Sequence, residues 1–337
     1  MRFIRPEYFD NFKCIASACL RSCCVGWEIA IDEESEYRYL AQEFGGDSFI
    51  TNSISKEEHC FLRDSQGRCL MLDEDGLCKI IKRYGEGMLC EICREHPRYY
   101  NLLPDRVEGG LGLCCITAGE AILAMKLPPV YLDGETECDY EPEVDNRSAF
   151  VLSFRAWLEE GIVDGAPVEK IIERIANSAA CSDDFALDAE KEALSVGETI
   201  CRLKERVALK RGYSIPVIPL CGLEPLPRHR DGWADFLSVA QSPSEGEYPS
   251  PLYRAAHRRL IFYFLHRYLC AEEQERLSPG LIMAVTLPRL ILDVALLRGA
   301  DSISELATVA SEFSESFEYS TENVALYLRR IEEKYEA

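Results

Sequence analysis

Residues 69–78 read Cys-Leu-Met-Leu-Asp-Glu-Asp-Gly-Leu-Cys, and this stretch decides the fold of the N-terminal part of the chain. Asp75-Gly76 is a turn signal placed between two short apolar runs. Such a turn between apolar runs is typical of a β-hairpin. We therefore expect a hairpin with residues 73–76 as its loop and a cysteine near each end.

The register of this hairpin determines how its two cysteines lie. With a four-residue loop, Leu72 faces Leu77 and Met71 faces Cys78. Cys69 and Cys78 are then diagonal neighbours on one face, about 7 to 8 Å apart. That separation suits two ligands of one metal cluster, although a two-residue turn would shift the register and weaken the argument.

Cysteines are concentrated in the first part of the chain. Twelve of the sixteen precede residue 140. A dense run spans residues 14–24, a C-x-x-C pair lies at 90–93, and the pair at 114–115 follows a glycine-rich segment. The predicted metal ligands are Cys19, Cys23, Cys24, Cys69, Cys78, Cys90 and Cys93, with Cys14 and Cys114 as further candidates.

The chemistry of these thiols depends on the compartment. The first residues lack the apolar stretch of a secretory signal, so we expect a cytoplasmic protein, in which thiols stay reduced. Clustered thiolates are soft ligands for iron-sulfur clusters and zinc. The thiols outnumber the four ligands that one zinc ion takes, which favours an iron-sulfur cluster. Zinc stays open as the alternative, since two zinc sites could bind eight thiols. Inert core cysteines and a disulfide scaffold are weaker interpretations.

The net charge is -21, from 58 acidic and 37 basic residues. Such a charge repels nucleic acid and attracts a lysine-bearing protein substrate. The most apolar stretch, 281–297, contains Pro288, Arg289 and Asp293 and is shorter than the roughly 20 residues that span a bilayer. We expect a buried, kinked helix there and no membrane partner.

The pattern predicts an α+β protein with an irregular Cys-rich metal-binding region at 1–140 and a mainly helical domain at 149–337. Trp27, Ile29 and Ile31 alternate with polar or small residues, which predicts a half-buried strand, and Asp32 is expected to cap a helix over 33–43. Helical spacing predicts further helices at 149–161, 167–179, 186–211, 251–271, 278–298, 301–316 and 321–336. Loops are expected at 216–227 and 241–251.

Several motifs, in order along the chain, resemble the flagellin lysine N-methylase family, of the FliB type. They are Phe12-Lys13-Cys14-Ile15, Cys19-x3-Cys23-Cys24, Gly26-Trp27 through Ile31-Asp32, Gly67-Arg68-Cys69 through Gly76-Leu77-Cys78, Cys93-Arg94-Glu95-His96-Pro97-Arg98 and, more weakly, Arg259 to Tyr268. The first third also resembles a wider group of zinc- or iron-chelating proteins.

The resemblance implies methyl transfer from S-adenosylmethionine to lysines of flagellin, in a protein that holds an iron-sulfur cluster, of the 4Fe-4S kind. This chain has His96 where the family often has Tyr, and Cys115 where it has Pro. A non-catalytic metal-binding or metal-chaperoning protein with a helical docking domain is the alternative. A redox enzyme is a third possibility.

The residues do not identify a catalytic base or a cofactor-binding loop. Tyr99 and Tyr100 are candidate bases, but packing explains them more simply. Gly109, Gly110 and Gly112 lack the preceding strand and following helix of a dinucleotide-binding loop. Catalytic residues, the S-adenosylmethionine site and the oligomeric state are therefore unassigned at this stage.

Overall fold

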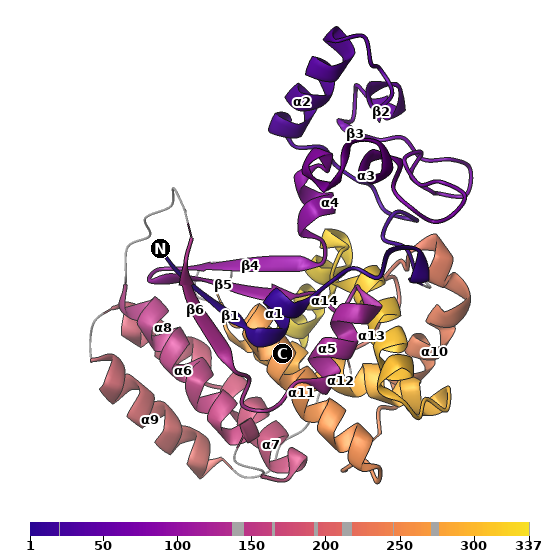
Figure 1. Cartoon of the computed structure of the whole chain (residues 1–337). Helices are drawn as coiled ribbons and strands as arrows, with labels where there is room; N and C mark the ends of the chain where they lie inside the picture. Colours follow the sequence, from indigo (N-terminus) through magenta and orange to yellow (C-terminus); the bar gives the residue numbers. More distant parts are fainter. Residues whose placement is uncertain are drawn as a thin grey trace. The chain divides into compact units, whose positions relative to one another are not determined.

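The computed structural model describes residues 1–19, 21–136, 145–163, 166–191, 195–210, 218–244, 246–270 and 276–336. The chain divides into two compact units (Figure 1). The Cys-rich unit comprises Lys13–Tyr99 and Leu226–Arg228, and the helical unit comprises Met1–Phe12, Tyr100–Pro225 and His229–Ala337. Residues 140–144 of the expected boundary between 140 and 149 lie outside the described residues.

The helical unit contains a four-stranded sheet in the order β4-β5-β1-β6. Its strands are β1 (Arg2–Pro6), β4 (Arg98–Leu103), β5 (Arg106–Leu111) and β6 (Tyr131–Glu135). β1 runs parallel to β5 and antiparallel to β6, with Ile4 opposite Glu108 and Pro6 opposite Tyr131. The sheet thereby brings the N-terminus of the chain beside segments more than a hundred residues away.

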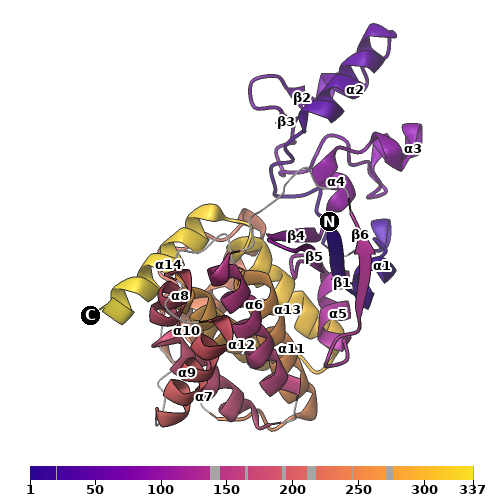
Figure 2. The ribbon, with the colours of Figure 1, turned by 90° about the vertical axis from the view of Figure 1, so that its left-hand side faces the viewer.

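Helices make up the rest of the helical unit. They are α1 (Glu7–Asn11), α5 (Ile116–Ala124), α6 (Asn146–Val163), α7 (Val168–Ala179), α8 (Ser182–Glu190), α9 (Val196–Leu209), α10 (Arg230–Gln241), α11 (Pro251–Tyr268), α12 (Ser278–Leu297), α13 (Ile303–Phe317) and α14 (Thr321–Glu336). α6 packs against α8 and α9, and α12 packs against α7, α10, α11 and α13 (Figure 2).

The apolar helix α12 forms the centre of this packing. Nearly every residue from Ser278 to Ala295 is buried, as expected for a core helix with apolar residues on all sides. Among the described residues, α12 is the one helix long and apolar enough to cross a membrane, but 83% of its apolar window is buried inside the protein. The same composition is typical of a core helix in a soluble protein.

The Cys-rich unit has little regular structure. It contains the helices α2 (Glu33–Phe44), α3 (Lys79–Tyr84) and α4 (Glu91–Glu95), the short strands β2 (Ile54–Ser55) and β3 (Cys60–Phe61), and the 3-10 turns η1 (Ala16–Ala18), η2 (Thr51–Ser53) and η3 (Glu86–Met88). A fourth 3-10 turn, η4 (Pro227–His229), lies where the chain passes from this unit to α10. Loops therefore carry most of its side chains.

The α+β class predicted from the sequence is confirmed, and most helices lie where helical spacing placed them. The strand predicted at 27–31 is wrong, since only Ala30 forms a bridge, to Cys60. Ile29 and Ile31 are nevertheless buried. The alternation of apolar and polar residues at 27–31 therefore reflects burial of the side chains and not pairing in a β-ladder. The helix expected over 186–211 is two helices, α8 and α9, separated by residues that include 192–194, outside the described part. The sequence analysis missed α10.

A close approach of α5 and α13 depends on Gly119. A Cβ atom added there would lie 3.3 Å from Ala307 Cβ. We expect Gly119→Leu to lower the free energy of unfolding by about 1–3 kcal/mol, because the larger side chain forces the helices apart. Gly197→Leu is the matched control, since a Cβ at that helical position meets nothing within 4 Å. Equal midpoints of urea unfolding for the two variants would contradict the prediction.

Candidate metal centre

Five cysteines from three separate loops share the hydrophobic core of the Cys-rich unit. Cys69 and Cys90 are buried in this core, beside Ile29, Tyr39 and Ile80. Cys24, Cys78 and Cys93 are partly buried and pack against it. We call these five residues the thiol core: Cys24, Cys69, Cys78, Cys90 and Cys93. Each of them was predicted as a metal ligand from the sequence.

The loop between Cys69 and Cys78 is a turn, as predicted, but its register is wrong by one residue. Leu72 pairs with Cys78 and not with Leu77. The Asp73 carboxylate accepts a hydrogen bond from Leu77 N at 2.7 Å, and Asp73 N donates to Leu77 O. These bonds close a longer loop than the one predicted, and the two cysteines still reach the same core.

Backbone hydrogen bonds tie the Cys23-Cys24 loop to the Cys69 segment. Cys69 N donates to Cys24 O at 2.8 Å, and Gly26 N donates to Gly67 O at 2.9 Å. Gly26 and Gly67 both have positive φ, at 85° and 74°. Glycine adopts this conformation without the strain that a side chain would add. The two glycines of the sequence motif therefore allow the loops to approach closely.

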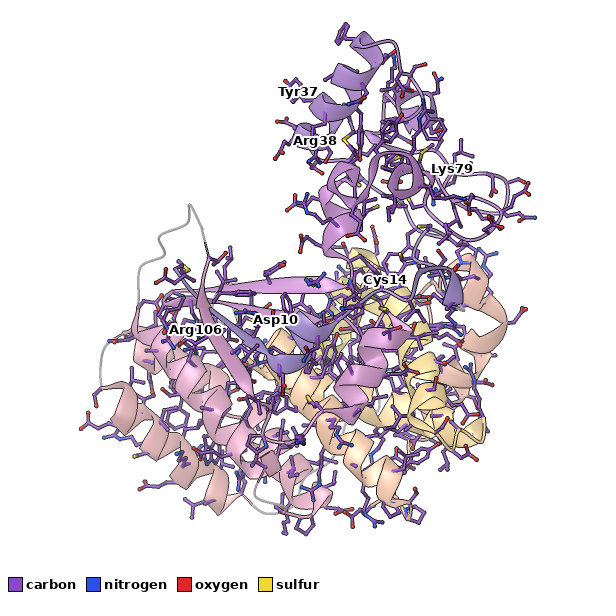
Figure 3. All side chains as sticks on the ribbon, in the orientation of Figure 1. Asp10, Cys14, Tyr37, Arg38, Lys79 and Arg106 are labelled. Atoms are coloured by element: carbon purple, nitrogen blue, oxygen red, sulfur yellow. The ribbon has the colours of Figure 1, made fainter. Side chains whose placement is uncertain are left out.

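Helix α2 positions the Cys90–Cys93 turn. The Asp32 carboxylate caps α2 by accepting from Ser35 N at 2.9 Å, and it also accepts from Glu91 N, in the first turn of α4, at 2.8 Å. Arg38, labelled in Figure 3, donates to Leu89 O at 3.1 Å. One carboxylate thus fixes the starts of two helices, and one of them carries Cys90 and Cys93.

Lys79, at the start of α3 in Figure 3, ties Cys78 to the same loop system. Its backbone N donates to Met71 O and its Nζ donates to Leu70 O, both at 2.8 Å. Cys78 occupies the N-cap position of α3, and its side chain makes no capping hydrogen bond there. The position of the Cys78 thiol is therefore set by residues on both sides of the turn.

The thiols influence one another's protonation. A hydrogen bond from the Cys23 thiol lowers the pKa of Cys24 to about 7, and one from Cys93 lowers the pKa of Cys90. Burial, together with the charges of Cys24, Cys78 and Cys90, raises the pKa of Cys69 to about 12. A bound cation would relieve this crowding of negative charge, because thiolate and metal ligation favour each other.

Other candidate cysteines have different surroundings. The Cys19 thiol donates to Arg21 O at 3.0 Å, and Cys14 is exposed and accepts from Ala16 N at 3.4 Å. Cys60 is buried, and its thiol lies 3.7 Å from Glu58 Oε2. Cys114 is buried in the helical unit, where its carbonyl accepts from Ser311. The roles of Cys19 and Cys23 as ligands stay predictions.

The thiol core presents soft sulfur donors. Among the described residues, no three His, Cys, Asp or Glu side chains are placed to hold one metal ion as they stand. A zinc ion would need its sulfurs about 2.3 Å away, which brings four thiolates very close together. The thiol core offers five soft sulfur donors and no histidine, and an iron-sulfur cluster uses four such thiolates.

The glycine-rich segment serves packing and not a nucleotide loop. Gly109 lies in β5, where an added Cβ would come within 2.8 Å of the Phe3 ring. A Cβ at Gly112 would lie 2.5 Å from Tyr319 Oη. These glycines let the sheet pack against aromatic rings. The sequence analysis missed the strand and the helix around them, which are β5 and α5.

Arg228 supports the thiol core, and the sequence analysis did not single it out. Its guanidinium donates to the Ser22 carbonyl at 3.0 Å and to the Val25 carbonyl, and it lies 5.8 Å from the centre of the Trp27 ring. These contacts join the two ends of the Cys23-Cys24 turn. No local pattern could reveal them, because more than 200 residues separate Arg228 from this loop.

Asp32→Asn tests the shared cap. Burial works to raise the pKa of Asp32, but hydrogen bonds from Glu91 and Ser35 lower it to about 2. Asparagine has one acceptor oxygen, so we expect a loss of about 1 kcal/mol at pH 7. The wild-type advantage is present above about pH 4 and disappears as the pH falls toward 2, because the folded pKa lies below the unfolded one. Denaturant unfolding at several pH values measures it, and a pH-independent difference would contradict it.

Arg228→Met tests the support of the Cys23-Cys24 turn. Methionine keeps an apolar chain over Trp27 but cannot donate to the carbonyls of Ser22 and Val25. We expect the anaerobically purified variant to hold less than half of the wild-type metal, as measured by elemental analysis. Arg230→Met, at an exposed position of α10, removes the same charge and should keep the full metal content. Equal metal in both variants would refute this role.

The comparisons with known proteins give a consistent group of relatives. The chain is 30% identical over 130 residues to the flagellar biosynthetic protein FliU of Salmonella muenchen, a match that covers 35% of this chain and 75% of FliU. It is also 30% identical over 130 residues to the lysine-N-methylases of Salmonella choleraesuis and Salmonella typhimurium, and spans 31% of their length. No family model and no solved structure matches. Since three quarters of FliU is covered, the chain belongs to the family of FliU and the FliB-type lysine-N-methylases.

Proposed function

We propose that this protein is a cytoplasmic lysine N-methyltransferase that acts on flagellin, with S-adenosylmethionine as methyl donor and an iron-sulfur cluster held by the thiol core. The observation that carries the proposal is a coincidence of two features. The motifs that resemble the family are concentrated at residues 12–98, and the same segment folds into the unit that gathers the thiols. The printed names of the relatives supply the reaction class.

The thiol core supports the cofactor part of the proposal. Cys24, Cys69, Cys78, Cys90 and Cys93 would hold the cluster, with Cys23 adjacent to Cys24. Since an iron-sulfur cluster takes four thiolate ligands, one of the five cysteines would not bind iron and could adjust the local charge. When bound, a cluster supplies a metal centre that accepts an electron or ligates an anionic group. Zinc would supply only a Lewis acid.

The charge of the chain supports a basic protein substrate. The net charge of -21 attracts lysine-rich surfaces over long range. The first turn of α2 carries Glu33, Glu34 and Glu36 on the Cys-rich unit. Flagellin itself is proposed because relatives are named for flagellar biosynthesis and lysine methylation.

A non-catalytic metal-binding protein is the second candidate. It is favoured by the partial coverage, since the chain spans only 31% of the lysine-N-methylases that it matches. The absence of a nucleotide loop at Gly109 and Gly112, where the glycines meet aromatic side chains, agrees with it too. In this candidate function the protein binds a metal at the thiol core but does not catalyse methyl transfer.

A methyl-transfer assay separates the two candidates. Metal-replete protein is incubated anaerobically with S-adenosylmethionine and flagellin, and the intact mass of flagellin is measured. We expect additions of one methyl mass each, at least tenfold fewer with Cys78→Ala, and no change with Cys201→Ala, an exposed cysteine of α9. Elemental analysis of the same samples should find iron in the wild type and Cys201→Ala but not in Cys78→Ala.

Two results would contradict the proposal in different ways. A metal-replete wild type that leaves flagellin unmodified would remove the methylase for that substrate and leave the metal-binding candidate. Zinc without iron in a colourless, active sample would keep the transferase and overturn the iron-sulfur cluster.

A further inference from the structure

A buried polar site in the helical unit contains an imidazole without a hydrogen-bond partner. His266, on α11, is 5% exposed, and neither of its ring nitrogens has a partner among the described residues. Its Nε2 lies 3.8 Å from Glu108 Oε2 and its Nδ1 lies 3.9 Å from Glu159 Oε1. These separations are too long for direct hydrogen bonds. The imidazole therefore lies between two carboxylates without bonding to either.

The two carboxylates differ in how well they are satisfied. Glu108, on β5, accepts from Arg155 with both oxygens at 2.7 Å and from Arg106 at 2.8 Å. Burial works to raise the pKa of Glu108, but the guanidiniums of Arg155 and Arg106 hold it at about 2. Glu159 Oε1, on α6, is buried and has no hydrogen bond. Both oxygens of Glu108 thus accept hydrogen bonds, whereas Glu159 Oε1 is an acceptor without a donor.

Buried polar atoms without partners are costly and need an explanation. Here Glu159 Oε1, both His266 nitrogens and Arg155 Nη1 lack partners together, and Arg155 Nε lies 3.6 Å from Glu159 Oε1. These atoms come from α6 and α11, and β5 supplies Glu108 beside them, so the fold itself assembles the gap. A group from outside the chain that offers several N–H donors would satisfy the carboxylate and the imidazole at once.

We propose that Glu159 and His266 form a binding site for a primary ammonium group, that of a lysine side chain. This inference rests on the proposed function and names the part of the protein that receives the substrate. Glu159 Oε1 accepts one N–H of the ammonium and His266 Nδ1 accepts another. His266 then carries its own proton on Nε2, directed toward Glu108.

The charges around the site favour a cation over an anion. Arg155 faces Glu108 and Glu159, and Arg106 faces Glu108 and Asp105, so three carboxylates face two guanidiniums. The other titratable groups nearby are Tyr131 on β6 and Cys270 after α11, which interact with Glu159 and with Arg155. Burial raises the pKa of Tyr131, so its hydroxyl stays neutral. The net local charge is therefore negative.

Apolar surface for the stem of a lysine lies beside the imidazole. The Tyr131 ring is 5.9 Å from the His266 ring and the Phe262 ring is 6.1 Å from it. Tyr131 is 38% exposed and the Glu159 side chain is 19% exposed, so these two residues connect the site to solvent. Aromatic faces also attract ammonium groups. An approach past Tyr131 would bring the ammonium to Glu159 first.

The site also supplies a base for the methyl transfer. A lysine must lose a proton before its nitrogen can attack a methyl group. One N–H bond of the ammonium breaks, and the proton is transferred to Nδ1 of His266. The electron pair of the broken bond remains on the lysine nitrogen. The imidazolium formed is stabilised by the carboxylates of Glu108 and Glu159, on either side of the ring.

The test is a calorimetric titration of the full-length, anaerobically purified protein with Nα-acetyl-lysine methylamide. The control ligand is Nα-acetyl-norleucine methylamide, which has the same stem without the amine. Glu159→Gln removes the charge with little change in shape, and Glu160→Gln removes a charge from the next, exposed position of α6. We expect saturable binding of the lysine probe to wild type and Glu160→Gln, at least tenfold weaker binding to Glu159→Gln, and none of the norleucine probe.

The proposal is overturned if the lysine probe does not saturate, if both probes bind alike, or if Glu159→Gln binds as wild type does. Thermal unfolding of each variant verifies that the fold is kept, and Glu159→Asp, which retains the charge, should recover part of any lost affinity. Binding requires neither S-adenosylmethionine nor a metal. A protein that binds the lysine probe but never methylates therefore keeps this site and loses only the proposed reaction.

Discussion

The Cys-rich unit depends on the carboxylate of Asp32, because this one group joins the starts of two of its helices. Its one long helix, α2, and the short helix α4 both begin at this carboxylate, through Ser35 N and Glu91 N. In a unit where the strands are two residues long, no sheet can hold the loops together. Side-chain caps and carbonyl contacts from Arg38 and Arg228 take over that task. A cysteine-rich core is stable only if these polar contacts leave its sulfurs in place.

Much of the fold could be predicted because its signals are local. Asp32 as a cap, the apolar helix α12 and the turn at Gly76 each follow from neighbouring residues, and all three occur in the structure. The register of the Cys69–Cys78 turn could not be predicted, because it depends on the Asp73 side chain bonding to Leu77 N. The failed strand at Ile29 and Ile31 has a similar cause. Alternating burial is shared by strands and by extended loops that pack on a core.

The cysteines of the thiol core could be predicted from the sequence, but the residues that hold their loops in place could not. Clustered cysteines with turn residues between them pointed to Cys24, Cys69, Cys78, Cys90 and Cys93, and the structure brings these five into one core. The contact of Arg228 with the Cys23-Cys24 turn could not be predicted. An arginine beside a proline-rich segment belongs to no local pattern that assigns it to a loop about 200 residues earlier. The same holds for His266. No neighbouring residue marks it, and only the sheet places Glu108 beside it.

The two sites illustrate opposite ways of using buried charge. In the thiol core, burial and the neighbouring sulfurs raise the pKa of Cys69 and of Cys78, so ionising these thiols together without a bound cation is unfavourable. In the helical unit, the carboxylates of Glu108, Glu159 and Asp105 face the two guanidiniums of Arg155 and Arg106, which leaves a single negative charge. A site that must hold a resident cofactor benefits from a large unmet charge, because the affinity is then high. A site that must release its ligand after each turnover benefits from a small unmet charge. The division of charge between the two units therefore matches a permanently bound metal in one and a transient lysine in the other.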